Sequence, residues 1–228
     1  MANSGSTAGE PEPAPRAPRP GAGSEPPLDA TTWSGALIVM GVVGLSIFLV
    51  QVVNATQHYR LNRFGLQPRE IRGLWGVLTA PLLHQSYGQM LSDTVPLVAI
   101  GWLLLLSGLR TWLTVTAVVI VVGGFATWLV ARHGLIVGAG GVVFGWLGYL
   151  LARAYFSRKV RWIAAAVVVL FFFGTLLSNL LPSEHVSWES HLCGFLAGIL
   201  AGAALHPRNP RKRGTDPARR VGDASTSG

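Results

Sequence analysis

Long apolar stretches separated by short polar segments run along the chain from Trp33 onward. A bilayer core of ~30 Å needs ~20 residues of α-helix, and six stretches approach or reach that length. They cover residues 33–53, 89–106, 111–131, 138–156, 162–181 and 191–205. The pattern predicts an all-α membrane protein, a bundle of six transmembrane helices within a membrane domain over residues 33–206.

The remaining segments are polar or mixed. Residues 54–83 are polar early and apolar late, which predicts an interfacial segment lying on the membrane rather than a span. Residues 1–32 are rich in Pro, Gly, Ala and Ser, and residues 207–228 are basic and polar. Both compositions favour disordered tails, because such segments bury too little apolar surface to offset the entropy of ordering. We expect that residues 1–32 are not a secretory signal peptide.

Composition supports a membrane protein. Half of the 228 residues are apolar and 12% are charged, whereas a soluble domain carries about 25% charged residues. The formal charge of +8 lies mostly in loops and in the C-terminal tail, so it predicts contact with anionic membrane lipid and no nucleic acid partner. The single cysteine, Cys193, excludes an intrachain disulfide. No cofactor is indicated.

The basic residues also predict an orientation. Six spans place both termini on one side, and that side has the larger share of the loop and tail Lys and Arg residues, including Arg158, Lys159 and Arg161. The positive-inside rule then places both termini in the cytoplasm of a bacterial-type cell membrane. The glycine-rich turn at residues 138–141 and His191 lie near the outer face.

Ionisable residues inside spans are costly and raise functional hypotheses. Asp93 lies one helical turn after Gln89, so both project from one face of the second span. The alternative for Asp93 is a solvated polar patch near the outer interface. His191 begins a stripe with Gly194, Gly198 and Gly202, the small-residue spacing that lets membrane helices pack closely. Such a stripe by itself often serves packing alone.

Four motifs make the chain resemble a known family. They are GLWGVLT at residues 73–79, LHQSY at residues 83–87, VGAGGVVFG at residues 137–145 and SWESHLCGFLAG at residues 187–198. In this order along six spans, they resemble the rhomboid family of intramembrane serine proteases. The resemblance covers roughly residues 33–206 and implies the six-helix rhomboid fold.

The family cleaves transmembrane substrates with a Ser-His dyad, and a His and an Asn four residues apart stabilise the oxyanion. Carried onto this chain, the resemblance places the base at His191, which is present. The nucleophile position is Gly140, which has no side chain. The oxyanion positions are Gln89 and Asp93. An ionised Asp93 would oppose the negative charge that develops in the transition state.

These departures predict that peptide hydrolysis is lost, because covalent catalysis fails without its nucleophile. Ser92, Thr94 and Ser190 are alternative nucleophiles, but neighbouring helix positions point ~100° apart, so none is expected to face His191. Without a nucleophile, Asp93 could pair with His191. A metal site formed by His84, Asp93, Glu189 and His191 fits no standard ligand spacing, so none is expected.

Three functions remain open. The favoured one is an inactive rhomboid-like protein that binds transmembrane client proteins through the lateral opening that the family uses for substrate access. The alternative is an active serine endopeptidase with a non-standard nucleophile. The third is a packing scaffold without a selected role at the former site.

Overall fold

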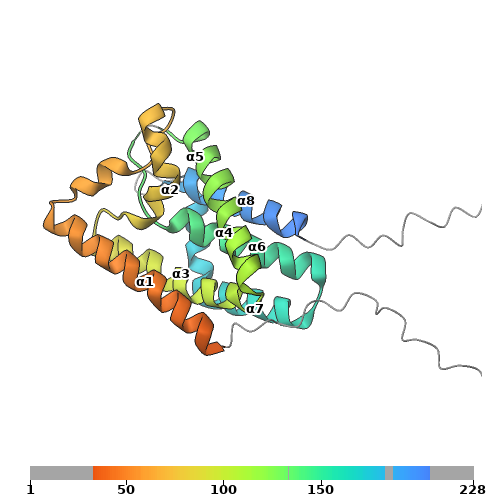
Figure 1. The fold of residues 1–228 in the computed structure, drawn as a ribbon. Helices are drawn as coiled ribbons and strands as arrows, with labels where there is room; N and C mark the ends of the chain where they lie inside the picture. Colours follow the sequence, from red (N-terminus) through yellow and green to blue (C-terminus); the bar gives the residue numbers. More distant parts are fainter. Residues whose placement is uncertain (1–32, 133, 183–186, 206–228) are drawn as a thin grey trace, which may run out of the picture.

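The described part of the chain, residues 33–132, 134–182 and 187–205 of a computed structural model, is a helical bundle without a named strand. The tails predicted at residues 1–32 and 207–228 lie outside it. The long helical segments are α1 (Trp33–Thr56), α3 (Tyr87–Leu105), α4 (Leu109–Val118) continued by η4 (Val119–Gly123) and α5 (Gly124–Val130), α6 (Gly140–Ser157), α7 (Val160–Phe173) continued by η5 (Gly174–Leu180), and α8 (Trp188–Ala204). Figure 1 shows their arrangement.

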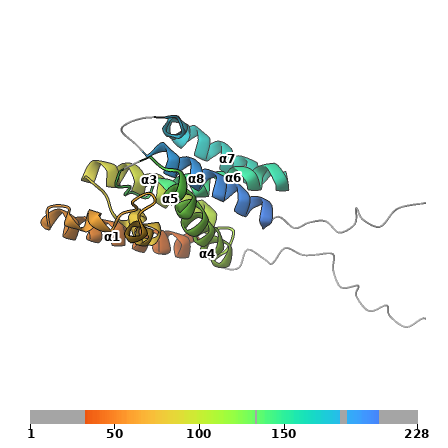
Figure 2. The ribbon, with the colours of Figure 1, turned by 90° about the horizontal axis from the view of Figure 1, so that it is seen from above.

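Four of these described segments are long and apolar enough to cross a membrane: Trp33–Thr56, Tyr87–Leu105, Leu109–Val130 and Val160–Leu180. α6 and α8 match the predicted fourth and sixth spans in position, but they are rich in glycine or shorter. α6 lies in the interior of the bundle, where other helices surround it (Figures 1 and 2), whereas α8 packs one face on α6 and exposes Leu196 and Leu200 on the other. The all-α membrane fold is confirmed, and the count of six spans stays a prediction.

α6 and α8 run parallel and form the tightest contact of the bundle. The three glycines of the predicted stripe all face α6: a Cβ on Gly194 would contact the backbone of Gly141, a Cβ on Gly198 the backbone of Gly145, and a Cβ on Gly202 the Cβ of Ala152 at 2.6 Å. The absence of these side chains lets the two backbones approach. This packing brings the first residues of both helices side by side.

The outer helices face away from this interior. α1 and α7 expose large apolar side chains such as Leu45, Phe171 and Phe172, which is the pattern of helices solvated by lipid. In contrast, α6 buries Phe144, Trp146 and Tyr149 almost completely. The bundle therefore has a close-packed centre and an apolar periphery.

The segment between α1 and α3 consists of short helices: η1 (Arg60–Phe64), η2 (Ile71–Trp75), α2 (Gly76–Thr79) and η3 (Ala80–Leu82). It covers the end of the bundle at which α6 and α8 begin, and Leu66 pairs with Ile136 in an isolated bridge. Ile71 and Trp75 are exposed, as expected for an interfacial segment. The residues before α6 line the site, and the segment of short helices lies beside it.

One boundary and one internal feature differ from the predicted spans. α8 begins at Trp188 rather than at His191, so Glu189 lies in its first turn, where an acidic side chain favours the helix N-terminus. In addition, the third helix contains a π-helical turn at Val119–Gly123. There Gly123 approaches α8, and an added Cβ would lie 3.2 Å from the Cα of Gly194.

Candidate functional site

A cavity of about 750 Å³ opens where α3, α6 and α8 begin. It brings together all four positions that the resemblance singled out: Gln89, Asp93, Gly140 and His191. Most of its other lining comes from the segment before α6 and from the start of α8. The full lining comprises Gln85, Ser86, Gln89, Ser92, Asp93, Ala131, Arg132, Gly134, Leu135, Ile136, Val137, Gly138, Gly140, Asn179, Ser187, Glu189, Ser190 and His191.

Gly140 and His191 are direct neighbours. A Cβ on Gly140 would contact Nε2 of His191 and lie 2.9 Å from its Cδ2. A serine at residue 140 would therefore meet the imidazole that the family uses as its base. In this chain the imidazole itself fills the space beside Gly140, and residue 140 has no side-chain atom that could act as a nucleophile.

His191 is held in one orientation. Its Nδ1 lies 3.1 Å from the carbonyl oxygen of Asn179, and because a carbonyl can only accept, Nδ1 carries the hydrogen. The ring also stacks on Phe144, with centroids 4.6 Å apart and planes inclined by 21°. These contacts leave Nε2 as an acceptor directed at residue 140, which is the arrangement of a general base without a nucleophile.

Gln89 supports the glycine turn. Its Nε2 donates to the carbonyl of Val137 at 2.9 Å, and its Oε1 accepts from the backbone N–H of Gln85 at 2.8 Å. Gly138 has φ +122°, and a Cβ there would lie 2.7 Å from the Gln89 nitrogen and 2.8 Å from an Asp93 oxygen. One amide hydrogen of Gln89 is therefore already used to hold the backbone.

Asp93 lies beside a different histidine from the one expected. Its Oδ2 is 3.5 Å from Nε2 of His84, whose side chain is fully buried. Within the described residues, the histidine within 4 Å of the Asp93 carboxylate is therefore His84 rather than His191, and the two form an ion pair only if His84 is protonated. Among the described residues, none donates a hydrogen bond to the Asp93 carboxylate, and both ring nitrogens of His84 also lack one.

Two buried asparagines hold His84 in place. Nδ2 of Asn54 donates to Oδ1 of Asn62 at 2.8 Å and to the His84 carbonyl at 3.3 Å, and Nδ2 of Asn62 reaches the same carbonyl at 3.4 Å. Sequence reasoning assigned no role to His84 beyond the improbable metal site. The available signal was a histidine immediately before a span that carries an acidic residue.

Two of the three alternative nucleophiles donate hydrogen bonds to backbone carbonyls. Ser92 Oγ donates to the carbonyl of Gln89 at 2.9 Å, and Ser190 Oγ donates to the carbonyl of Ser187 at 2.8 Å. Thr94 Oγ1 is buried without a hydrogen-bond partner. In the described part of the chain, none of the three forms a hydrogen bond to His191, so the geometry offers no substitute for a serine at residue 140.

An ion pair borders the cavity. Arg132 Nε lies 2.6 Å from Oε1 of Glu189, and the guanidinium also lies 5.9 Å from the ring centre of Trp188. This pair joins the residues after α5 to the first turn of α8. Sequence reasoning missed it, because it placed Glu189 in a loop. Across the described residues, no group of three or more His, Cys, Asp or Glu side chains could hold a metal ion.

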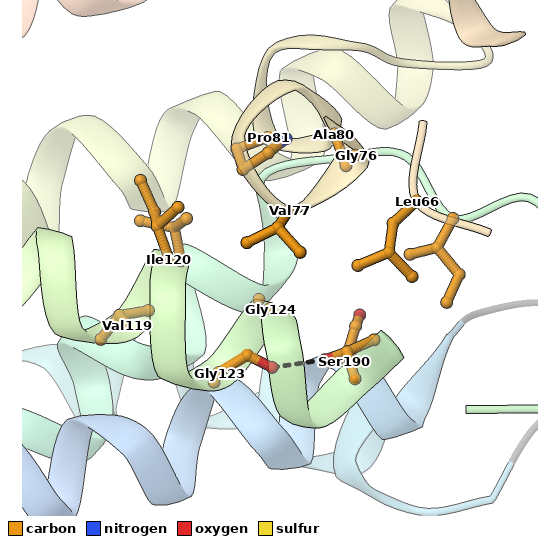
Figure 3. A pocket seen from close by; sticks show the side chains of 16 residues that line it. Leu66, Gly76, Val77, Ala80, Pro81, Val119, Ile120, Gly123, Gly124 and Ser190 are labelled. Atoms are coloured by element: carbon orange, nitrogen blue, oxygen red, sulfur yellow. Dashed lines mark hydrogen bonds between the residues drawn. The ribbon is translucent and has the colours of Figure 1, made fainter. Parts of the chain in front are cut away.

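A second, smaller pocket adjoins the cavity, since Ile136, Gly138 and Ser190 line both (Figure 3). Its volume is about 50 Å³. Its walls are mostly apolar, and the hydroxyl of nearby Thr127 donates to the Gly123 carbonyl at 2.8 Å. The pocket has room for only a few water molecules, so the larger cavity is the candidate site.

Comparison with known proteins gives one family. The rhomboid domain matches residues 72–208. An uncharacterized protein of Mycobacterium tuberculosis is 36% identical over 181 residues, which cover 75% of this chain and 75% of that protein. Another of Mycobacterium leprae is 32% identical over 200 residues, covering 81% and 79%. The matched domain contains every residue that lines the cavity.

Proposed function

The chain belongs to the rhomboid family of integral membrane proteins, and from that premise we propose that it does not hydrolyse peptides but binds transmembrane segments of other proteins. The observation that carries the proposal is the contact between residue 140 and His191. The base position is occupied, oriented and adjacent to the nucleophile position, yet Gly140 supplies no attacking atom. Without a nucleophile, the acyl-enzyme cannot form.

The oxyanion positions support the same conclusion. Gln89 has one amide hydrogen tied to Val137, and Asp93 places a carboxylate where negative charge would develop. A transition state with a growing oxyanion needs donors aimed at that charge, and a carboxylate acts in the opposite sense. The site is therefore unsuited both to the nucleophilic attack on a peptide and to the stabilisation of the oxyanion that would follow.

The alternative, an endopeptidase with a non-standard nucleophile, has little support. Ser92 and Ser190 donate their hydroxyl hydrogens to carbonyls of nearby residues, whereas an activated nucleophile needs a hydrogen bond to its base. The binding proposal instead relies on the cavity and on the loose contact between two of the helices near it. A large cavity persists, and α3 and α7 contact each other sparingly compared with the α6–α8 pair, so a client helix could approach between them.

We also propose a bacterial cell membrane as the location, with both termini in the cytoplasm. The mycobacterial relatives and the basic residues of the α6–α7 loop support this placement. The cavity, which lies at the opposite end of α6 from that loop, would then open toward the outer face. A client would present the outer end of its transmembrane helix to the cavity.

Site-specific photo-crosslinking in the native membrane tests client binding. A photoreactive residue would replace Val95 on α3 or Phe172 on α7, with Leu45 on α1 as the matched control, because the three are similarly exposed at 59%, 68% and 57%. We expect Val95 and Phe172 to yield protein adducts that map to transmembrane segments. Adducts no more frequent than at Leu45 would favour a packing scaffold and refute binding.

A further inference from the structure

The structure points to a chemical class of client: we propose that the cavity receives a lysine or arginine side chain from the outer end of a bound transmembrane segment, with Asp93 as its counter-ion. This inference rests on the proposed client binding. It assigns Asp93 the role of a specificity-determining residue. In the family pattern the same position holds an uncharged Asn.

Asp93 is a carboxylate in need of a donor. Its side chain is 18% exposed and lines the cavity, yet none of the described residues donates a hydrogen bond to it. Nε2 of His84 lies 3.5 Å from the carboxylate, close enough for an ion pair when His84 is protonated, but it forms no hydrogen bond. A largely buried charge that lacks hydrogen-bond donors is costly, and charges within membrane proteins typically face a partner or a pathway. A cationic group entering the cavity would supply the missing donors.

The charged and catalytic-position neighbours of Asp93 in the cavity are already engaged, although the Ser187 hydroxyl has no hydrogen-bond partner in the described part of the chain. Glu189 is paired with Arg132 at 2.6 Å, so this acid and this base offset each other. His191 uses Nδ1 on the Asn179 carbonyl, and Gln89 bridges two backbone groups. Among the described residues, Asp93 is therefore the acidic group of the cavity without a permanent cation beside it, because His84 is a cation only when it is protonated.

Access to Asp93 follows from the glycines of the turn. A Cβ on Gly138 would lie 2.8 Å from the Asp93 Oδ2, so any other residue would cover the carboxylate from that side. Gly140 likewise places no side chain in the cavity. A volume of about 750 Å³ falls in the range of pockets that enclose small ligands, so an extended basic side chain fits.

The test uses three synthetic transmembrane peptides that are identical except for one residue at the outer end of the apolar segment: lysine, glutamine or glutamate. Each carries the same photoreactive group and is mixed with the purified full-length protein in zwitterionic phosphatidylcholine liposomes. A charge-assisted hydrogen bond to Asp93 should give the lysine peptide roughly a tenfold higher crosslinking affinity than the glutamine peptide. The glutamate peptide should bind least.

Two variants assign the preference to its residue. Asp93→Asn should remove the preference for lysine while the glutamine peptide still binds. The control is Glu70→Gln, which removes one exposed negative charge from the segment before α3, outside the cavity lining. It should leave the preference unchanged. A lysine preference that survives Asp93→Asn would overturn the inference.

The peptide comparison also distinguishes a failure of this inference from a failure of the proposed client binding. If the natural protein crosslinks all three peptides equally, the role of Asp93 is wrong and client binding stands. If none of the three peptides crosslinks to the protein above the background signal of protein-free liposomes, the proposed client binding is refuted. Because the peptides are compared on the natural protein, the conclusion does not depend on whether a variant folds.

Discussion

Replacing Gly198 by alanine tests the packing that brings residue 140 and His191 together. A Cβ on residue 198 would lie 2.7 Å from the carbonyl carbon of Gly145 and 2.9 Å from the backbone nitrogen of Tyr149. Both are backbone atoms, so no side-chain rotation relieves the overlap. Because non-bonded carbon atoms favour separations of about 3.5–4.0 Å, α6 and α8 would have to move apart by roughly 1 Å.

The size of the effect follows from that displacement. A gap of roughly 1 Å forfeits about half of the dispersion energy of the facing atoms, and an extra methyl group in a packed interior costs about 1–3 kcal/mol. Alanine returns about 0.5–1 kcal/mol because it favours the helix over glycine. Because the overlap is with backbone atoms, the upper end of that cost applies, and we expect Gly198→Ala to lower the free energy of unfolding by about 2 kcal/mol. The measurement is a reversible SDS titration in mixed micelles, followed by tryptophan fluorescence.

Gly41→Ala is the matched control. Gly41 lies within α1, and an added Cβ would meet nothing within 4 Å. Only the helix preference changes there, so Gly41→Ala should leave the stability unchanged or raise it by up to about 1 kcal/mol. If the two variants shift the SDS midpoint equally, close backbone approach does not hold α6 against α8, and the reasoning about the glycine stripe is refuted.

Two further predictions concern the site. Gly134→Ala should lower the free energy of unfolding by about 1 kcal/mol, because φ is +133° but an added Cβ would meet nothing within 4 Å. Gly138→Ala should lower it by about 2–4 kcal/mol, because the added Cβ would also overlap Gln89 and Asp93. Equal losses of stability in the SDS titration would show that backbone strain alone determines the cost. Gly140→Ser alone should stay unlabelled by a fluorophosphonate, and combining it with Gln89→His and Asp93→Asn should produce labelling. Equal labelling of the single and triple variants would show that the oxyanion positions do not matter.

The positions of the long helices could be predicted from the sequence, because the membrane imposes a simple length rule. The predicted first and second spans begin and end within three residues of α1 and α3. The start of α8 was less predictable. Polar residues precede His191, and hydropathy alone cannot distinguish a polar loop from a polar first helical turn in which Glu189 binds Arg132.

The contacts within the site were harder to predict than the identity of the residues that form it. Motif spacing was sufficient to select Gly140, Gln89 and Asp93, and the structure places them around one cavity with His191. The partner of Asp93 depended on how the segment before α3 folds back, which is fixed by the buried Asn54–Asn62 contact. The π-helical turn at residues 119–123 also has no hydropathy signal, because it arises from packing against α8.

The most direct test of the central claim is fluorophosphonate labelling of the purified natural protein, beside His191→Ala and a heat-denatured sample. With Gly140 at the nucleophile position, we expect no labelling of either protein above the denatured background. Labelling of the natural protein that disappears in His191→Ala would reveal a serine activated by His191 and would contradict the loss of hydrolysis.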